Sequence, residues 1–327
     1  MSEPLLSVKN LKTYFYTYEG VVKALEGVNF KIDKNQIIGL VGETACGKSV
    51  TALSIMGLIQ DPGKIIDGEI FFDGVNLLKN SKDEMRQIRG KKIAMIFQEP
   101  MTSINPMFTI GNQIAEIIML HEKVGKKEAM GKALEMLKSV KMSDPEEVLK
   151  KYPHEMSGGM RQRAMIAMAL SCHPQLLIAD EPTTFLDVTV QAQILKLMKE
   201  LAQEIGASVL MITHDMGVVA QMCDEVNVMY AGLVIESAKT REIFHNPKHP
   251  YTTGLMKAVP KIVKTNVKLD SIPGTVPNLI TPPSGCRFHP RCSHVMDICK
   301  EAIPKAVEIT PGHRVSCFLY SRRSDDV

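Results

Sequence analysis

The sequence predicts an α/β protein whose core is a sheet covered by helices, followed by a small loop-rich region that carries cysteines. Over most of the chain, short apolar runs of strand length alternate with longer runs at helical spacing. Strands that are apolar on both faces are typical of parallel sheets with helices on either side. From about residue 245 onward proline becomes frequent and the periodicity fades, which indicates an appendage with little regular structure.

The strands of the core are expected at five short runs that are apolar almost throughout. They lie at residues 36–41, 92–97, 175–180, 208–213 and 225–230. Runs of this length without alternation predict strands buried on both faces.

Helices are predicted between these strands. One follows the first strand at residues 48–59, and an amphipathic one covers residues 188–206, with Gly206 as its C-terminal stop. A Lys- and Glu-rich segment between residues 110 and 152 has apolar residues at helical spacing, which predicts a helical insertion. The residues that carry this spacing are Met130, Ala133, Leu134, Leu137 and Val140.

Composition limits the classes of function. The chain has 327 residues, is 45% hydrophobic and carries a net charge of +3, so nothing indicates a basic nucleic-acid surface. The 21 methionines are read as core packing, because there is no tryptophan and few aromatic residues. The N-terminus has no apolar signal core, and no apolar run approaches the roughly 18 residues of a membrane span. We therefore expect a cytosolic protein with reduced thiols.

A phosphate-binding loop is predicted at residues 42–49, GETACGKS, between a strand and a helix. This spacing, G-x-x-x-x-G-K-S, places backbone N–H groups and a helix N-terminus around phosphates. Lys48 would contact the β- and γ-phosphates, and Ser49 would bind Mg²⁺.

A second site element is expected where the run LLIADE ends a buried strand. Asp180 lies at its C-terminal end, the edge at which open α/β sheets bind ligands, and Glu181 follows. Asp180 would contact the Mg²⁺ shell, and Glu181 would polarise the attacking water.

Between these elements, MSGGMRQR (residues 156–163) resembles the signature of ABC-type ATPases, whose usual core is L-S-G-G-Q. Other motifs follow in the family's order: Gln98 resembles the Q-loop residue, Asp187 the D-loop residue and His214 the switch histidine. Phe15 resembles the aromatic residue that stacks on adenine. Met160, where glutamine is usual, and Phe185, where a small residue is common, depart from the pattern without removing a catalytic group.

The resemblance implies a P-loop ABC ATPase with a mixed sheet core. Glu181, His214 and Gln98 would be catalytic, and Ser49, Gln98 and Asp180 would hold Mg²⁺. In a head-to-tail dimer, Ser157, Gly158, Gly159 and Asp187 would act on the partner subunit's ATP. The remaining ATP-binding residues would be Phe15, Gly42, Glu43, Thr44, Ala45, Cys46, Gly47, Lys48, Ser49, Val50 and Asp180.

Two domains are implied: a nucleotide-binding domain at residues 1–255, with a helical subdomain at about 100–165, and a C-terminal region at residues 256–327. That region resembles the tail of oligopeptide and dipeptide importer ATPases. The matching residues are Gly285, Cys286, Arg287, Phe288, His289, Pro290, Arg291, Cys292, Cys299, Pro304, Gly312, His313 and Cys317.

The importer resemblance implies partners and a location. The partners would be a second ATPase subunit in a hetero- or homodimer, transmembrane permeases and, indirectly, a solute-binding protein. The location would be the cytoplasmic face of the cell membrane. Nickel and some sugar importers share such ATPases, so the solute stays open. A soluble ABC ATPase acting on nucleic acid, or a redox sensor, is the alternative class. The chain lacks the coiled coils and zinc fingers of the first, and intact Glu181 and His214 argue against the second.

Four cysteines, Cys286, Cys292, Cys299 and Cys317, are separated by five, six and seventeen residues. This spacing fits neither paired structural zinc ligands nor ferredoxin runs, so it leaves iron–sulfur and zinc open. The importer resemblance implies a 4Fe-4S cluster, with zinc as the alternative and no metal as a third. We expect such a site to hold together a segment that has few apolar residues.

The remaining cysteines receive simpler interpretations. Cys172 and Cys223 are expected to be buried small residues. Cys46 lies near a helix N-terminus and Lys48, which would favour its thiolate, so its alkylation is expected to block ATP binding.

Overall fold

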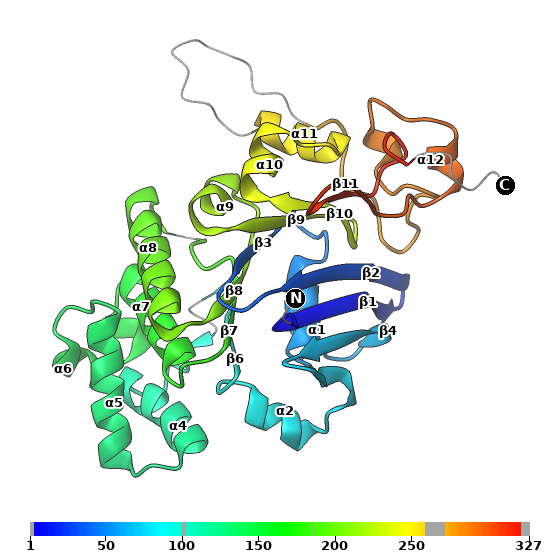
Figure 1. The fold of residues 1–327 in the computed structure, drawn as a ribbon. Coiled ribbons are helices and arrows are strands. Elements are labelled where there is room, and N and C mark those ends of the chain that lie inside the picture. Colours follow the sequence, from blue (N-terminus) through cyan, green and yellow to red (C-terminus); the bar gives the residue numbers. More distant parts are fainter. Residues whose placement is uncertain (1–2, 100–102, 185, 259–271, 322–327) are drawn as a thin grey trace, which may run out of the picture. The chain divides into compact units, whose positions relative to one another are not determined.

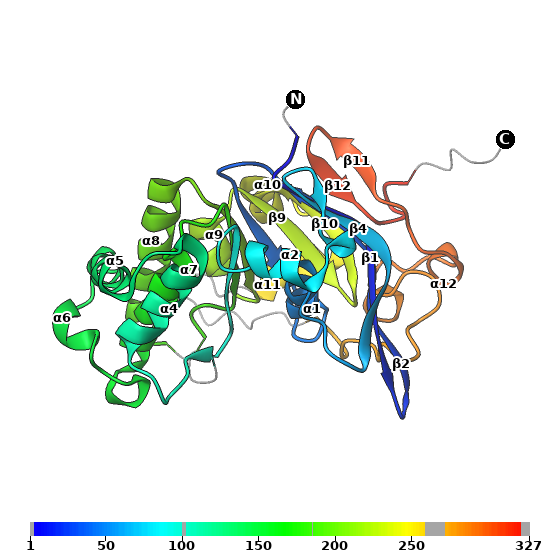
Figure 2. The ribbon, with the colours of Figure 1, turned by 90° about the horizontal axis from the view of Figure 1, so that it is seen from below.

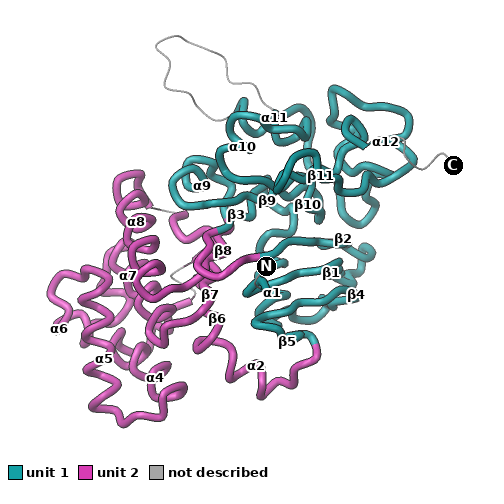
Figure 3. Tube along the Cα trace, viewed as in Figure 1, with its two compact units in different colours: residues 1–31, 38–78, 213–327 teal, residues 32–37, 79–212 magenta. Residues whose placement is uncertain are grey.

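The computed structural model describes residues 3–99, 103–184, 186–258 and 272–321. Contacts divide the chain into two compact units (Figure 3). Unit 1 combines Met1–Lys31, Ile38–Leu78 and Thr213–Val327, and unit 2 combines Ile32–Ile37 and Lys79–Ile212. The chain therefore leaves unit 1 and returns to it, and its C-terminal region belongs to the same unit as the predicted phosphate loop.

Unit 1 contains an antiparallel sheet that the sequence reading did not predict. Its order is β2 (Gly20–Ile32), β1 (Leu6–Thr17), β4 (Gly63–Phe72) and β5 (Val75–Asn76). Buried and exposed residues alternate along much of β1, as expected for a sheet with one face on the core. A register shift after Lys9 and the exposed Tyr16 near its end obscure this alternation in the sequence.

Unit 1 also contains the first and the last of the five predicted strands. β3 (Ile37–Val41) pairs in parallel with β9 (Glu225–Tyr230), which pairs antiparallel with β10 (Leu233–Lys239). All five residues of β3 are buried, which confirms the prediction of a strand covered on both faces. Helices of this unit are α1 (Lys48–Ile55), α9 (Met216–Met222), α10 (Thr240–His245) and α11 (Pro250–Ala258).

The C-terminal region is more regular than expected. β12 (His313–Val315) pairs antiparallel with β10 and with β11 (Val307–Thr310), so the tail extends the sheet. Two short helices, η3 (His289–Arg291) and α12 (Ile298–Glu301), lie in the cysteine-bearing part (Figure 1). The described residues 272–321 are still mostly turns and loops, as predicted, but these short elements give the region some regular structure.

Unit 2 holds the other predicted strands. β6 (Ile93–Ile96), β7 (Leu176–Asp180) and β8 (Ser208–Thr213) form parallel pairs, with Ile93 opposite Leu176 and Leu177 opposite Val209. Each predicted strand is confirmed to within about a residue at either end, which confirms an α/β core with a mixed sheet.

The helices of unit 2 include the predicted insertion. The elements in and near it are α4 (Ile110–Glu122), α5 (Lys126–Ser139), α6 (Pro145–Val148), η2 (Pro153–Glu155) and α7 (Gly158–Leu170). Within the unit α4, α5 and α7 lie close together (Figure 2). α2 (Lys82–Ile88) begins at a Ser81 capping box, and α8 (Val188–Ile205) ends at Gly206 in a left-handed conformation, as predicted.

Candidate nucleotide site

The phosphate loop occupies the turn between β3 and α1. Gly42 and Gly47 have φ angles of 156° and 105°. A Cβ on Gly42 would lie 2.2 Å from the Met229 carbonyl oxygen, and one on Gly47 would lie 2.8 Å from the Ala24 carbonyl oxygen. Both positions therefore require glycine, which explains the motif's spacing through the fold as well as through phosphate binding.

Lys48 begins α1 and points back into the loop. Its buried Nζ donates to the carbonyl oxygens of Gly42, at 2.9 Å, and Glu43, at 3.0 Å. The ammonium charge is thus held beside the loop's backbone, where a phosphate anion would meet it together with the N-terminal N–H groups of the helix.

Cys46 does not have the thiolate character expected from the sequence. The side chain is fully buried, and this burial raises the pKa of the thiol despite the nearby Lys48 charge. The cost of burying a thiolate outweighs the attraction of the lysine at this position. The interpretation of Cys46 as an activated thiol is wrong.

The aromatic residues near the end of β1 face different surroundings. Phe15 is half-buried, and its ring covers Gly63 of β4, where a Cβ would lie 2.6 Å from Cε1. The Tyr14 hydroxyl donates to Glu26 at 2.6 Å, and burial followed by this bond raises its pKa to about 12. Tyr16 is exposed, with the Lys64 ammonium 5.7 Å from its ring centre. The role of Phe15 stays a prediction.

In unit 2, two of the predicted catalytic residues lie together. Gln98 Nε2 donates to Glu181 Oε2 at 3.1 Å, although 83 residues separate them. Thr184, which the sequence reading did not single out, donates its hydroxyl to the same oxygen at 3.0 Å. Asp180 is buried at the end of β7, and Glu181 has a positive φ of 46°. The Glu181 carboxylate is therefore oriented by one donor from the turn after β7, Thr184, and one from the segment after β6, Gln98.

The other motif residues of unit 2 lie at helix N-termini. Ser157 caps α7, where its hydroxyl accepts from the Met160 N–H at 3.4 Å. The glycines Gly158 and Gly159 form the first turn of that helix. Asp187 caps α8 by accepting from the N–H groups of Thr189 and Val190 at 3.1 and 2.9 Å. Asp187 thus has a structural role as well as its predicted role at a partner's ATP.

The remaining assignments are placed as follows. His214, in unit 1, is exposed between β8 and α9. Phe185 lies outside the described residues. Val50 is half-buried in the first turn of α1, and Thr44 and Ala45 are exposed in the loop.

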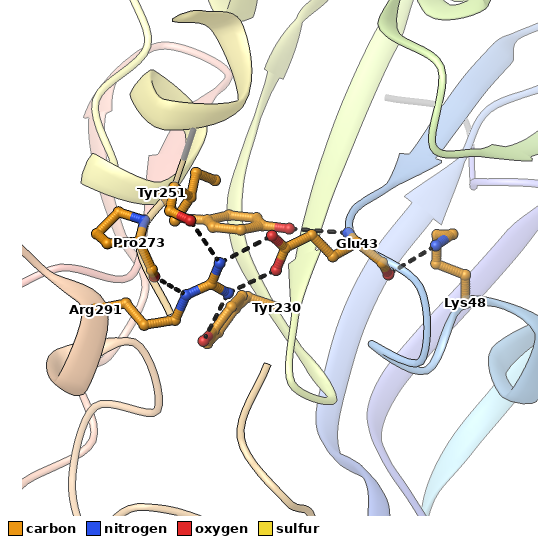
Figure 4. A network of polar contacts seen from close by, with 7 residues as sticks. Glu43, Lys48, Tyr230, Tyr251, Pro273 and Arg291 are labelled. Atoms are coloured by element: carbon orange, nitrogen blue, oxygen red, sulfur yellow. Dashed lines mark hydrogen bonds and ion pairs between the residues drawn. The ribbon is translucent and has the colours of Figure 1, made fainter. Parts of the chain in front are cut away.

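Sequence reasoning missed three residues of unit 1 that contact the phosphate loop: Tyr251, Arg291 and Gly232. The Tyr251 hydroxyl accepts from the Glu43 N–H at 2.9 Å (Figure 4). Arg291, from the cysteine-bearing region, forms an ion pair with the Glu43 carboxylate at 2.7 Å. Gly232, in the turn between β9 and β10, donates its N–H to the Cys46 carbonyl oxygen at 2.9 Å. For Arg291, the only signal in the sequence was its place in the run CRFHPRC, which resembles the importer tail; nothing there indicated a contact with the phosphate loop.

The four C-terminal cysteines line one small cavity of about 10 Å³, room for about one water molecule. Burial raises the thiol pKa of Cys286 and Cys292, and raises that of Cys317 to about 11. Among the described residues, no group of three or more His, Cys, Asp or Glu side chains is arranged to hold a metal ion. The structure therefore brings the cysteines together but does not bear out the expected metal-binding domain.

The three histidines near the cysteines in the sequence, His289, His294 and His313, contact other groups. His313 Nε2 lies 2.7 Å from the Glu236 carboxylate, a buried pair that ties β12 to β10. His289 Nδ1 lies 3.0 Å from the Cys286 carbonyl oxygen, and the His294 N–H donates to the Cys292 sulfur at 3.4 Å.

A glycine loop that closes on a buried lysine at the start of a helix is typical of P-loop nucleotide-binding proteins. Two family models match the chain: ABC transporter over residues 25–184, and oligopeptide/dipeptide transporter, C-terminal region, over residues 235–299.

Curated relatives match nearly the full length. The chain is 51% identical to the oligopeptide transport ATP-binding protein AppD of Bacillus subtilis, covering 97% of each chain. It is 48% identical to the oligopeptide transport ATP-binding protein OppD of Escherichia coli, covering 97% of this chain and 94% of that one. A probable peptide ABC transporter ATP-binding protein of Sinorhizobium fredii is 52% identical over 99% of this chain and 96% of that one. The chain belongs to the ATP-binding subunits of the oligopeptide and dipeptide ABC transporter family.

Solved structures agree on the fold. The ATP-binding cassette MJ0796, a dimer in a post-hydrolysis state bound to ADP and Pi, is 28% identical with a TM-score of 0.65, over 72% of this chain and 99% of that one. The cbiO1 protein of Clostridium perfringens, part of a transporter complex, is 27% identical with a TM-score of 0.64, over 75% of this chain and 92% of that one. Within the described part of the chain, no helix combines the length and apolar character that crossing a membrane requires.

Proposed function

We propose that this chain hydrolyses ATP at a dimer interface and thereby powers the import of dipeptides or oligopeptides through partner membrane subunits. The observation that carries the proposal is the glycine loop that closes on Lys48, in a chain about half identical over nearly its whole length to proteins named as oligopeptide transport ATP-binding proteins. The related OppD and AppD names specify peptides, which favours peptides over nickel or sugars as the solute.

Nucleotide binding is assigned to the loop and the start of α1. The N–H groups of residues 44–48 and the Lys48 ammonium would hold the β- and γ-phosphates, since a helix N-terminus and a fixed cation both favour anions. Phe15 would contact the adenine. Mg²⁺, when bound, would neutralise charge on the phosphates, and Ser49, Gln98 and Asp180 are its proposed ligands.

Hydrolysis is assigned to the carboxylate of Glu181. The carboxylate would accept a hydrogen bond from the attacking water and polarise it. Gln98 and Thr184 both donate to its Oε2, so they fix the direction in which the carboxylate points. His214 would contact the γ-phosphate and sense its departure.

A complete site requires two subunits in this proposal. Ser157, Gly158 and Gly159 begin α7, and the N–H groups of this first turn would bind the γ-phosphate of the ATP held by the partner. The dimeric state of the MJ0796 cassette, which is similar over 72% of this chain, supports this arrangement. ATP binding would close the dimer and hydrolysis would release it, so that chemistry produces motion.

The partners would be a second ATPase subunit, identical or different, and transmembrane permeases that receive peptide from a solute-binding protein. The chain would then act at the cytoplasmic face of the cell membrane. Residues 1–255 would form the nucleotide-binding domain, with the helical subdomain at about 100–165 transmitting motion to the permeases. Residues 256–327 would form the C-terminal region.

A 4Fe-4S cluster on Cys286, Cys292, Cys299 and Cys317 is part of the proposal, with zinc as the alternative. Four soft thiol donors on one cavity are a donor set that suits either group. The cavity has room for about one water molecule, so the cysteines would have to move apart to accept a cluster. Bound metal would add cross-links between η3, α12 and the segment after β12.

Metal analysis tests this part. The protein is purified without oxygen, its visible spectrum is recorded, and iron and zinc are measured per chain. About four irons and a broad band near roughly 400 nm support the cluster. One zinc without colour supports the alternative, and the absence of both metals contradicts the site.

Transport tests the function as a whole. The complete complex is placed in membrane vesicles, and ATP-dependent uptake of a labelled oligopeptide is measured with the parent chain and with Glu181→Gln. We expect uptake with the parent and none with the variant. Uptake of nickel or a sugar in place of peptide would contradict the solute assignment, while ATP hydrolysis without any dependence on permeases would contradict the transport role.

A further inference from the structure

We propose that Arg291 is a positioning residue for the phosphate loop, through which the cysteine-bearing region sets the affinity for nucleotide. This inference rests on the proposed assignment of residues 42–49 to the ATP phosphates. It concerns contacts within unit 1 alone, between η3 and the loop after β3.

The Arg291 guanidinium meets the Glu43 carboxylate with both of its ends. Nη1 lies 2.7 Å from Oε2, and Nη2 lies 3.0 Å from Oε1 (Figure 4). Paired bonds of this kind combine charge with a fixed planar geometry, so they define direction as well as attraction. An arginine guanidinium is always charged in a protein, so the contact is an ion pair as well as a pair of hydrogen bonds.

The rest of the arginine is held by its surroundings. Nε donates to the Pro273 carbonyl oxygen at 2.7 Å, and Nη1 lies 3.4 Å from the Tyr230 hydroxyl. The guanidinium carbon lies 5.7 Å from the centre of the Tyr230 ring. Only 6% of the Arg291 side chain is exposed, against 28% for Glu43. A pair shielded in this way is stronger than an exposed one, and breaking it leaves a partly buried charge without its partner.

The segment that carries Arg291 is itself anchored to the core. Phe288, three residues earlier, is buried between Tyr230 and Tyr251, with ring centres 5.1 and 5.4 Å away. Arg287 forms an ion pair with Glu26 at 3.1 Å and donates to the Ala231 carbonyl oxygen. The position of the guanidinium is therefore set by packing rather than by a flexible tail.

At the other end of the pair, Glu43 is the second residue of the phosphate loop, and it is held at three points. Its N–H donates to the Tyr251 hydroxyl, its carbonyl oxygen accepts from Lys48, and its carboxylate accepts from Arg291. The loop's N–H groups must converge before phosphate arrives, and each fixed point reduces the ordering that binding has to impose. Arg291 also neutralises a carboxylate that would otherwise repel the triphosphate.

Affinity for ATP measures the proposed role. In the full chain, Arg291→Gln is expected to raise the dissociation constant for ATP about tenfold, since a shielded charge pair is broken beside an anion site. Arg291→Lys keeps the charge but loses the paired geometry, so we expect a smaller rise. Turnover at saturating ATP is expected to change less than about twofold, because Arg291 touches no reacting atom.

Glu43→Gln provides the coupling test. Added to Arg291→Gln, it is expected to cause no further loss of affinity and to recover part of it, because the uncompensated carboxylate is gone. A residue that only stabilised the fold would give additive losses instead. Glu43→Gln also tests the pair from the loop side if Arg291→Gln fails to fold.

Arg314→Gln is the matched control, because Arg314 forms an exposed ion pair with Glu308 within the same region. Its ATP affinity is expected to equal that of the parent. Equal affinity in Arg291→Gln and the parent, or an equal loss in the Arg314 variant, would overturn the inference. Lys48→Ala separates the two proposals: if it abolishes ATP binding while Arg291→Gln keeps the parent's dissociation constant, the loop assignment stands and the role of Arg291 falls. If Lys48→Ala binds ATP normally, the loop assignment itself falls.

Discussion

The phosphate loop and the cavity of the four cysteines lie in the same unit, but they are held in shape by different means. The loop is built from consecutive backbone groups, with Lys48 bound to two loop carbonyls and glycines at two positions where a Cβ would collide. Distant residues add contacts at Glu43 and Cys46. The cysteines converge only because distant packing brings η3, α12 and the segment after β12 together. A site made of consecutive backbone groups is formed before its ligand arrives, whereas a site made of scattered side chains is completed by the ligand.

The largest effect is expected from removing the Lys48 ammonium group from the phosphate loop. Lys48→Ala is expected to reduce ATP hydrolysis by about 10²–10³-fold, because a fixed charge on the phosphates is lost. Steady-state turnover measures the effect, and Lys150→Ala, an exposed lysine of unit 2 paired with Glu147, is the control. Hydrolysis within a few-fold of the parent would show that the loop is not the phosphate site.

The second prediction concerns the packing that assembles the cysteine cavity. Phe288→Ala removes a buried ring from contact with Tyr230, Tyr251 and His249, and should cost about 3–5 kcal/mol of unfolding free energy. Denaturant unfolding of the full chain measures it. Phe108→Ala, at a ring that is 52% exposed, should cost far less. Equal costs would contradict the idea that Phe288 anchors the C-terminal region.

The sequence could predict features that depend on neighbouring residues, but not features that depend on contacts between distant parts of the chain. Lys48, Asp180 and the strands before them follow from local patterns, and the structure confirms the strands. The anchoring by Phe288 and the ion pair of Arg291 with Glu43, 248 residues apart, depend on contacts that no local pattern encodes. The antiparallel sheet of β1, β2 and β4 was missed because a register shift after Lys9 interrupts the alternation of β1 and Tyr16 is exposed near its end. The short strands of the tail were missed because β12 is only three residues long.

The third and smallest effect is a pH dependence of the cysteine cavity in the metal-free chain. Burial first raises the pKa of Cys317 to about 11, with the neighbouring cysteines adding to it, whereas an exposed thiol has a pKa of about 8.5. The folded state therefore holds this proton more tightly than the unfolded state, so its contribution to stability is present below about pH 8.5 and is lost as the pH rises toward 11.

Lysines and tyrosines also titrate between pH 8 and 11, so the parent is compared with Cys317→Ser at each pH. The variant shares those other groups and lacks only the Cys317 thiol. The difference in unfolding free energy between parent and variant is expected to fall as the pH rises from 8 to 11, measured by denaturant unfolding in the presence of a chelator. A difference that stays constant or grows would contradict the raised pKa.

The central claim is that ATP is bound between two subunits and that Glu181 is required to hydrolyse it. The most direct measurement is the oligomeric state of Glu181→Gln with ATP and Mg²⁺, by light scattering after gel filtration, alone and with its partner ATPase subunit. We predict a stable ATP-bound dimer without turnover, because the variant keeps every binding group but loses the carboxylate that polarises water. A monomer that holds ATP, or a variant that hydrolyses ATP at the parent's rate, would contradict the account.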